Sequence, residues 1–528
     1  MSLSARGTIA PFVGHLRPEA PSNANTARVS SWRRALVERI PSGRPERAAL
    51  IGLVCLLAIG GALRVLFMLA WRPAFMGFPD ASAYVSMASG SLWADPTHEV
   101  GYALFLRDLH ALGGVLWPTI VIQHVSGLLS ATFWWLIIRR CGGRPWLALI
   151  PAAVVALDGG EMFLEHSTLS ESLFIVLVSA AIYFAVRSLD GIGARSAALA
   201  GLLLAVACTV RVVALPLLGV LLLWLMLMSG GGTRRRLRRA AAAAACAVAV
   251  LGGYAIVQHQ QTGYWGLTTP AGAWNLYSRV APFADCHEFT PPPGTSVLCE
   301  RTPPAQRTTS VAEYAYGNSS PAVRAFSWGD GPYSATAADN RKLASFTKTA
   351  ILHQPLDYLR TFAEGMAAYV APIRVEFSNR SELAPSDQFF FHRNLFDRAT
   401  LAVAARHALP YYGAHSFHED RSLMSFLFAY ESTARITGPM MAMMMALSLF
   451  ALFAPVGRPR QVGRLLFLIA WTTLIVAPAT HEWDARYTIP ALGPLAAVAT
   501  LGAWQLGNLV SRRGRALQRV RARADSSD

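Results

Sequence analysis

Charged residues are scarce in this sequence of 528 residues. They make up 15% of the chain, whereas hydrophobic residues make up 53%. Because a soluble domain carries about 25% charged residues, this composition excludes an ordinary soluble globular protein. Apolar runs such as 48–70 are long enough to cross a bilayer, which takes about 20 helical residues. The sequence therefore predicts an all-α polytopic membrane protein.

Lysine is nearly absent, and zinc-binding spacings and phosphate-binding glycine loops are missing. Of the 47 basic residues, only Lys342 and Lys348 are lysine, a bias towards arginine that indicates a GC-rich bacterial genome. No C-x-x-C or histidine-rich spacing indicates a zinc site, and no glycine-rich loop indicates bound nucleotide. We therefore predict no metal ligands and no firm cofactor, and leave the need for a divalent metal open.

The basic residues lie mainly on one predicted side of the membrane. Threading the apolar runs alternately leaves 27 basic and 6 acidic residues on the side of both termini, against 20 and 25 elsewhere. The positive-inside rule then predicts a cytoplasmic N-terminus, a cytoplasmic C-terminus and about ten helices. Topology and anionic membrane lipids explain the basic excess, so we predict no nucleic-acid partner. The ten runs are 48–70, 113–138, 146–157, 171–186, 196–210, 212–229, 240–258, 430–454, 465–478 and 488–510.

The same threading divides the chain into regions. Residues 1–47 lack the apolar stretch of a signal peptide and are basic, so they predict a mostly disordered cytoplasmic arm. Apolar residues recur at helical spacing near 336–353, 355–370 and 395–408, which predicts a mainly helical non-cytoplasmic domain. The remaining predicted regions are an N-terminal membrane module at 48–259 with about seven helices, its first loop at 72–112, the non-cytoplasmic domain at 260–429, about three C-terminal helices in 430–510, and a basic cytoplasmic tail at 511–528.

Cys286 and Cys299 lie thirteen residues apart in the predicted non-cytoplasmic domain. An exported segment meets an oxidising compartment, which favours a disulfide between them. The alternative is two unrelated thiols.

Asp80 is the first candidate for chemistry, because it follows the first apolar run and precedes a predicted short surface helix at 81–92. A carboxylate at this position is a good general base. The alternative is a helix N-cap, for which Asp is a preferred residue. Tyr84, one turn further on, and Tyr102 in the same loop are predicted to contact substrate.

A second acidic cluster spans 158–171, behind an apolar run of only about 12 residues. Either this helix ends inside the protein or the acidic loop enters a cavity, since irregular backbone at membrane depth must be buried in protein or wet. Glu161 and Glu165 share a helix face and would raise one another's pKa. We predict that Glu161, Glu165 and Glu171 orient substrate. For Glu171 the alternative is a capping box beginning at Thr168.

Two arginines are candidates for binding a lipid phosphate, which guanidinium groups hold through paired donors. Arg211 lies at the non-cytoplasmic tip of a helical hairpin, where the alternative is snorkelling to the interface. Arg64 lies nearer its helix end, so snorkelling is favoured there. In the last interhelical loop, His481 and Arg486 are predicted near the phosphate and Glu482 near substrate. The alternative is a simple Glu482–Arg486 pair at four-residue spacing.

Together these segments resemble the GT-C superfamily of membrane glycosyltransferases, near the dolichyl-phosphate-mannose protein mannosyltransferases and the aminoarabinose transferases. The sequence departs from that pattern at Val100, where many relatives carry proline, and in having a single Asp80 rather than an acidic pair. The segments that carry the resemblance are Asp80-Ala81-Ser82-Ala83-Tyr84, Gly101-Tyr102-Ala103-Leu104-Phe105-Leu106, Leu169-Ser170-Glu171-Ser172-Leu173-Phe174, Arg211, His353-Gln354-Pro355-Leu356-Asp357-Tyr358-Leu359, and Glu482 with Arg486-Tyr487-Thr488-Ile489-Pro490.

The resemblance implies a GT-C-like bundle that transfers a hexose or pentose from a polyprenyl-phosphate donor with inversion. Asp80 would be its catalytic base, and the acceptor would be a glycan, a lipid or a protein. The location implied is a bacterial cytoplasmic membrane, with the site on the non-cytoplasmic face and a role in cell-envelope glycan or glycolipid synthesis. The rival function is a transporter or flippase of lipid or sugar. Against that rival, the sequence predicts no inverted repeat and no paired broken helices.

Overall fold

The computed structural model describes residues 43–191, 193–266, 272–327, 335–371, 375–376, 383–384, 398–453, 457–481 and 483–524. Side chains are described for these residues except 375–376, 383–384 and 512–524. The chain divides into two units, 1–48 and 49–528. The predicted cytoplasmic arm therefore lies almost entirely outside the described residues.

Each of the ten apolar runs coincides largely with one or two helices of the described structure. Six of the described helices are long and apolar enough to cross a membrane, or up to eight if each of two bent pairs is one span. The polytopic helical fold is confirmed, whereas the count of ten spans is not. The helices are α2 (Arg44–Ala70), α5 (Trp117–Arg139), α6 (Leu149–Leu157), α8 (Glu171–Arg187), α9 (Gly193–Val210), α10 (Ala214–Leu227), α11 (Thr233–Thr262), α20 (Gly438–Ala451), α21 (Arg458–Thr480) and α22 (Ile489–Ala524).

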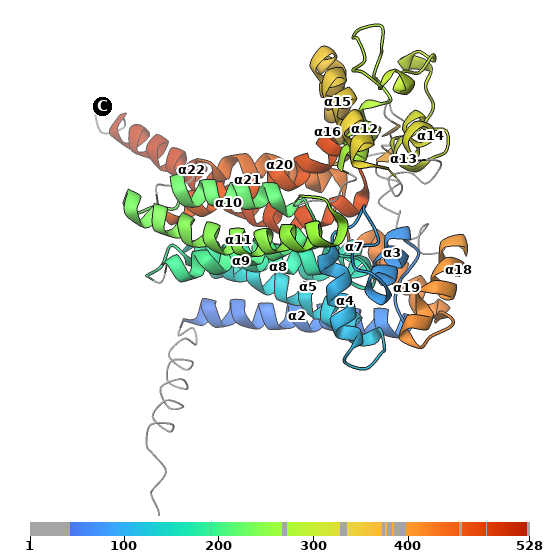
Figure 1. Ribbon diagram of the computed structural model, residues 1–528. Helices are drawn as coiled ribbons and strands as arrows, with labels where there is room; N and C mark the ends of the chain where they lie inside the picture. The colour runs from blue at the N-terminus through green and yellow to red at the C-terminus, as the bar shows by residue number, and fades with distance from the viewer. Residues whose placement is uncertain are drawn as a thin grey trace, which may run out of the picture. The chain divides into compact units, whose positions relative to one another are not determined.

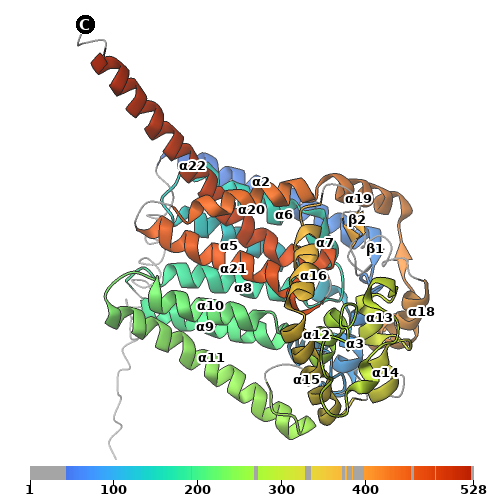
Figure 2. The same cartoon turned by 90° about the horizontal axis from the view of Figure 1, so that it is seen from above.

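The long helices run side by side, as both views of the bundle show (Figures 1 and 2). Small residues let some of them approach closely. Gly201 of α9 faces the backbone of Ala243 in α11, and a Cβ added at Gly201 would collide with the Ala243 carbonyl oxygen. Close approach through small residues is typical of helix packing in membranes, where dispersion contacts replace the hydrophobic effect.

Two helices of the bundle are broken, and their breaks contact one another. The segment Pro145–Leu157 meets α7 (Gly159–Glu165) at 52°, and α19 (Arg421–Thr433) meets α20 at 43°. The Gly159 N–H donates to the Ala434 carbonyl at 2.9 Å. The structure shows a bend at Asp158, and whether the short helix ends inside the protein or the acidic loop enters a cavity stays a prediction. The expectation of no paired broken helices is wrong. The Asp158 side chain accepts a hydrogen bond from the Glu161 N–H and so begins a separate helix, α7, after the bend.

The region between α11 and α20 is mainly helical, and the three helical patterns expected there are confirmed by α15, α16 and α18. Its strands are only two residues long: β2 pairs antiparallel with β3, and β4 pairs antiparallel with β1, which directly follows α2. Its elements are α12 (Gly272–Val280), η2 (Ser296–Leu298), η3 (Pro304–Gln306), α13 (Val311–Tyr316), α14 (Pro321–Phe326), α15 (Ala337–His353), α16 (Pro355–Ala368), β2 (Val375–Glu376), β3 (Leu383–Ala384), α18 (Arg398–His407), η6 (Leu409–Tyr412), β4 (His418–Glu419) and α19; β1 is Trp71–Arg72.

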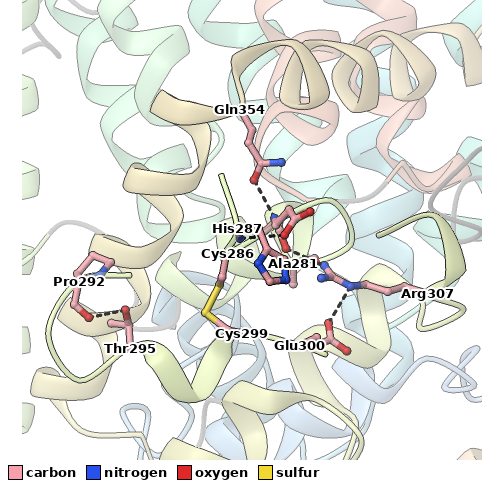
Figure 3. Close-up of a disulfide and its surroundings, with 11 residues drawn as sticks. Ala281, Cys286, His287, Pro292, Thr295, Cys299, Glu300, Arg307 and Gln354 are labelled. Atoms are coloured by element: carbon pink, nitrogen blue, oxygen red, sulfur yellow. Dashed lines mark hydrogen bonds and ion pairs between the residues drawn. A yellow bond between two sulfur atoms is a disulfide. The ribbon is translucent and has the colours of Figure 1, made fainter. Parts of the chain in front are cut away.

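A disulfide joins Cys286 to Cys299 in this region (Figure 3). Both cysteines pack against a hydrophobic cluster of their own, separate from the core of the bundle. Nearby, Arg307 donates to the Ala281 carbonyl at 2.6 Å and lies 3.5 Å from Glu300. The loop is thus held both covalently and by hydrogen bonds from one buried guanidinium.

Candidate active site

Four charged side chains from distant segments meet at one end of the bundle. Asp80 comes from α3 (Pro79–Ser89), Glu171 from the first turn of α8, Arg211 from just past the end of α9, and Arg486 from η7 (Ala485–Tyr487). We call Asp80, Glu171, Arg211 and Arg486 the Asp80 cluster. Helices α3, α4 (Val100–His110) and α7 lie at this same end in Figure 1.

Asp80 is paired with Arg486, whose Nη1 lies 2.7 Å from Oδ2. The side chain of Asp80 is 29% exposed, so the carboxylate remains accessible to a second molecule. The N-cap of α3 is Phe78, and Asp80 lies within the first turn. The N-cap alternative for Asp80 is therefore wrong, although the helix dipole still favours an acidic side chain there.

His98 and Asp95 extend the charge arrangement around Asp80. His98 Nε2 lies 3.8 Å from Asp80 Oδ1, and His98 Nδ1 lies 3.1 Å from Asp95 Oδ2. Burial favours a higher pKa for Asp80, but the positive charge of Arg486 and the His98 contact hold that pKa well below its usual range. Burial opposes charge on His98, but Asp80 and Asp95 raise its pKa to about 10. At neutral pH Asp80 is therefore an anion and His98 a cation.

Sequence reasoning did not assign His98 and Asp95 to the site. The usable signal was their three-residue spacing beside Pro96, which lets a turn bring imidazole and carboxylate together.

Arg211 binds Glu171, with 2.6 Å between Nη1 and Oε1. It also donates to the Ser170 hydroxyl at 3.1 Å, and so does the Tyr84 hydroxyl, at 3.1 Å. Because Ser170 is the N-cap of α8 without a side-chain capping bond, the capping-box alternative for Glu171 is wrong. Arg211 is directed at this buried carboxylate rather than snorkelling.

The two arginines of the Asp80 cluster share neighbours. Arg486 Nη1 is 4.0 Å from Glu171 Oε1, the oxygen that Arg211 binds. Their guanidinium carbons lie 5.9 Å (Arg211) and 5.1 Å (Arg486) from the centre of the Tyr487 ring. Two guanidinium groups converging in this way can bind one phosphate through paired, charge-assisted donors.

His481 follows the last turn of α21 and is largely buried. Burial and the positive charges of Arg486 and Arg279 lower the pKa of His481 to about 4. The imidazole is therefore neutral at pH 7 and offers a hydrogen bond rather than a charge. Glu482 lies outside the described residues. The acidic neighbour of Arg486 in this loop is Asp484, whose Oδ2 lies 3.4 Å from Arg486 Nε.

The second acidic cluster is organised around Arg64, not around Asp80. Arg64 Nε and Nη2 each lie 2.6 Å from one oxygen of Glu165, and His124 Nδ1 is 2.8 Å from Glu165 Oε2. His124 Nε2 in turn lies 3.1 Å from His166 Nδ1. Arg64 is only 2% exposed. Snorkelling of Arg64 is thus wrong, because its remaining Nη1 donates to the carbonyls of Gly60 and Ala156 inside the bundle.

Among the described residues, Glu161 and Glu165 form no hydrogen bond or ion pair with the Asp80 cluster. Glu161 is 2% exposed on α7, and its Oε2 has no hydrogen-bond partner in that part of the chain. Tyr102 is buried and donates to Gln123 Oε1 at 2.5 Å, with its ring 4.8 Å from that of Tyr84. Tyr102 therefore packs against Tyr84 on the side of the bundle interior, next to Gln123. Substrate binding by these residues stays a prediction.

The packing of α4 against α9 explains why the residue before Tyr102 is glycine. A Cβ added at Gly101 would lie 2.5 Å from the Thr209 carbonyl oxygen of α9. This close approach of α4 to α9 lies two residues before Arg211. The spacing of the helices, and with it the place of Arg211, thus depends on a missing side chain. Among the described residues, no group of three or more His, Cys, Asp or Glu could hold a metal ion.

No protein-family model matches the chain, and no curated protein sequence matches it. The chain is similar to the solved S. cerevisiae protein O-mannosyltransferase Pmt1-Pmt2 complex bound to the sugar donor, at 15% identity and a TM-score of 0.32, covering 44% of this chain and 35% of that one.

Two solved structures of the Archaeoglobus fulgidus oligosaccharyltransferase are also similar. The complex with Zn and sulfate has 12% identity and a TM-score of 0.40, covering 88% of this chain and 51% of that one. The complex of AglB with an inhibitory peptide and a dolichol-phosphate has 11% identity and a TM-score of 0.42, covering 89% and 52%. The chain thus spans between a third and about half of the length of these proteins.

Proposed function

We propose that the chain is a membrane glycosyltransferase that moves a sugar from a polyprenyl-phosphate donor to an acceptor hydroxyl. The observation that carries the proposal is the Asp80 cluster, in which a partly exposed carboxylate is paired with one of two converging guanidinium groups. A base beside a phosphate-binding pair of cations is what such a transfer needs. The cluster also lies at an end of membrane-spanning helices, where a lipid-linked donor would present its phosphate.

The proposed reaction uses Asp80 as general base. Asp80 takes the proton from the acceptor hydroxyl while that oxygen forms a bond to the anomeric carbon of the sugar. The bond from the anomeric carbon to the phosphate oxygen breaks on the opposite face, and polyprenyl phosphate leaves with the electron pair. Attack opposite the leaving group inverts the anomeric configuration. Arg211 and Arg486 stabilise the negative charge that develops on the departing phosphate.

Arg486 links donor binding to the strength of the base. In the structure its guanidinium group binds Asp80 and so lowers the pKa of that carboxyl. A donor phosphate competes for the same guanidinium group. As Arg486 turns from Asp80 to the phosphate, the pKa of Asp80 rises and the carboxylate becomes a better proton acceptor. The His98 cation, backed by Asp95, keeps one oxygen of Asp80 oriented meanwhile.

The charge distribution supports an active site on the non-cytoplasmic face. The first two turns of α11 carry Arg234, Arg235, Arg236, Arg238 and Arg239 at the end of the bundle away from Asp80. The positive-inside rule assigns that end to the cytoplasm. We propose a bacterial cytoplasmic membrane as the location, with a glycan, lipid or protein of the cell envelope as acceptor.

The experiment is a comparison of Asp80→Asn with Asp108→Asn in proteoliposomes that contain a radiolabelled polyprenyl-phosphate sugar. Asp108 is an exposed carboxylate of α4 near the same end, and serves as the matched control. Asp80→Asn is expected to lower transfer by about 10² to 10⁴, the usual contribution of general-base catalysis. Near-normal turnover in Asp80→Asn would remove this residue from the mechanism.

A second candidate function, transport or flipping, is favoured by one observation. The breaks at α6–α7 and α19–α20 contact each other, and paired broken helices line substrate sites in many transporters. The cavity there, which includes Asp158, Glu431 and Arg435, has a volume of about 40 Å³. A site for one water needs at least about 10–15 Å³, so this space holds a few waters but not a sugar. Movement of a labelled lipid across proteoliposomes without glycosidic product would favour the transporter.

A further inference from the structure

A second polar cavity lies at the opposite end of the bundle and is unused by the proposed reaction. It is formed by the loop after α8 and by the first turns of α9 and α11, and its volume is about 410 Å³. Small-molecule sites typically measure about 300–1,000 Å³. The cavity is lined by Leu189, Asp190, Gly191, Gly193, Ala194, Arg195, Arg235, Arg238 and Arg239.

The length of α9 separates this arginine-lined cavity from the Asp80 cluster. Helix α9 begins at Gly193 in the cavity and ends at Val210, one residue before Arg211. At 1.5 Å per residue its 18 residues span about 27 Å, close to the hydrocarbon thickness of about 30 Å. A ligand in the cavity would therefore lie at the other membrane surface and cannot contact the Asp80 cluster.

The cavity has more positive charge than the described residues neutralise. Arg195, Arg235 and Arg238 are exposed and have no ion-pair partner recorded in the described part of the chain. Arg239 is 8% exposed and donates to the Ser229 carbonyl at 3.0 Å, so it is held without a counter-charge.

Asp190 is the acidic residue of the lining, but its charge is already compensated. Its Oδ2 lies 2.5 Å from Arg140, and its Oδ1 lies 2.7 Å from Arg458. Both of those arginines lie outside the cavity lining. Asp190 therefore neutralises little of the positive charge on the four arginines that line the cavity.

The position of two of these arginines in their helices adds to the imbalance. Arg195 is in the first turn of α9 and Arg235 in the first turn of α11. The N-terminal end of a helix carries partial positive charge and favours anions, not cations. Two such ends and four guanidinium groups around one cavity repel each other, and an anion between them would relieve that repulsion. Guanidinium forks match the oxygens of a phosphate group best.

We propose that this cavity is a phosphate-binding site at the membrane surface away from the Asp80 cluster. The ligand chemistry is a phosphate group, supplied either by the headgroup of an anionic phospholipid or by free inorganic phosphate. Basic pockets between membrane helices commonly take such headgroups. The site holds its ligand through Arg195 of α9 and Arg235, Arg238 and Arg239 of α11, and so clamps these two neighbouring helices together at that surface.

The test uses the full-length protein purified in a neutral detergent and three single variants. Arg195→Gln and Arg238→Gln each remove one lining guanidinium, from different helices. Arg234→Gln is the matched control, because Arg234 is an exposed arginine of the same turn that does not line the cavity. Binding of dioleoylphosphatidylglycerol is measured by native mass spectrometry, with dioleoylphosphatidylcholine as the uncharged-headgroup comparison. A parallel titration with inorganic phosphate follows the unfolding temperature.

The expected result is retention of phosphatidylglycerol but not phosphatidylcholine by the wild type. Retention should fall about tenfold in Arg195→Gln and Arg238→Gln, as expected for one charge-assisted contact, and stay within about twofold in Arg234→Gln. Stabilisation by inorganic phosphate with the same dependence on the variants would assign the site to free phosphate instead of lipid. Binding of both probes that is unchanged in the two cavity variants overturns the proposal. So does an equal loss in Arg234→Gln, because the effect would then belong to the charge of the whole loop.

Discussion

Two arginine–carboxylate pairs of this protein have the same chemical groups but differ in how deeply they are buried. Arg64 and Glu165 have side chains only 3% and 1% exposed, and both carboxylate oxygens are bound. Arg486 and Asp80 are 14% and 29% exposed, and a single short contact joins them. The first pair ties α2 to α7 inside the bundle. The second pair is open to exchange with a substrate.

The difference shows how burial separates a structural ion pair from a reactive one. Removing one partner of a fully buried pair leaves an uncompensated charge in a region of low dielectric. A partly exposed pair loses less when it opens, since water or a substrate can replace the missing partner. The Asp80 cluster can therefore exchange partners during a reaction, whereas the Arg64–Glu165 pair holds the helices in place.

The largest expected effect is on folding. Glu165→Gln should lower the free energy of unfolding by about 3–5 kcal/mol, because it leaves Arg64 buried without a counter-charge. Chemical denaturation in detergent micelles measures this, with Asp80→Asn as the comparison that is expected to lose less stability, because Asp80 is partly exposed and Arg486 keeps Asp484 as a second partner. If Glu165→Gln folds like the wild type but loses transfer, the contrast between the pairs fails. Glu165 would then bind substrate, as its sequence context predicts.

The next effect concerns turnover. Arg211→Gln should reduce kcat by about 10² to 10³, as is typical when one group that stabilises transition-state charge is lost. The kcat of Arg211→Lys should lie between those of the wild type and Arg211→Gln, because lysine keeps the charge but loses the paired donors. Steady-state kinetics separate kcat from KM. A change in KM alone would mean that Arg211 binds the ground state and transition state equally.

A smaller effect follows from the contact between α4 and α9. Gly101→Ala should cost about 1–3 kcal/mol through overpacking, since the added methyl group meets the Thr209 backbone rather than a side chain that can move. Denaturation measures the loss. Gly113→Ala is the control, because a Cβ there has nothing within 4 Å. Equal stability of the two variants would show that the helix contact is not tight.

A separate effect is a pH dependence of stability carried by His98. Its pKa rises from an ordinary value of about 6.5 to about 10 in the folded protein, because Asp80 and Asp95 hold the proton against the effect of burial. Its contribution to stability is therefore complete below about pH 6.5 and is lost as the pH rises towards about 10. The difference in unfolding temperature between wild type and His98→Gln should shrink across that range. A difference that grows with pH contradicts the assignment.

Much of the fold could be predicted from the sequence, because helices in lipid must satisfy their own hydrogen bonds and therefore appear as long apolar runs. The helices α15, α16 and α18 were predictable for a similar reason, from apolar residues at helical spacing. The pairing of the two broken helices was not. It depends on the Asp158 cap and on backbone contacts between Gly159 and Ala434, which are far apart in the chain.

The candidate site divides in the same way. The polar segments could be predicted to gather at one end, because alternating spans place every second loop on the same side of the membrane. The ion-pair partner of each charged side chain could not be predicted. Glu165 and Glu171 are six residues apart, yet one binds Arg64 of α2 and the other binds Arg211 after α9.

The sequence by itself determined which segments form apolar helices and which loops carry acidic and basic side chains, because hydrophobicity and charge act locally along the chain. Only the tertiary structure decided which carboxylate is sealed by Arg64 and which remains open beside Arg486. That choice depends on where helices more than a hundred residues away pack, and on the bend that turns Glu165 inward. Spacing in a sequence cannot specify either of these.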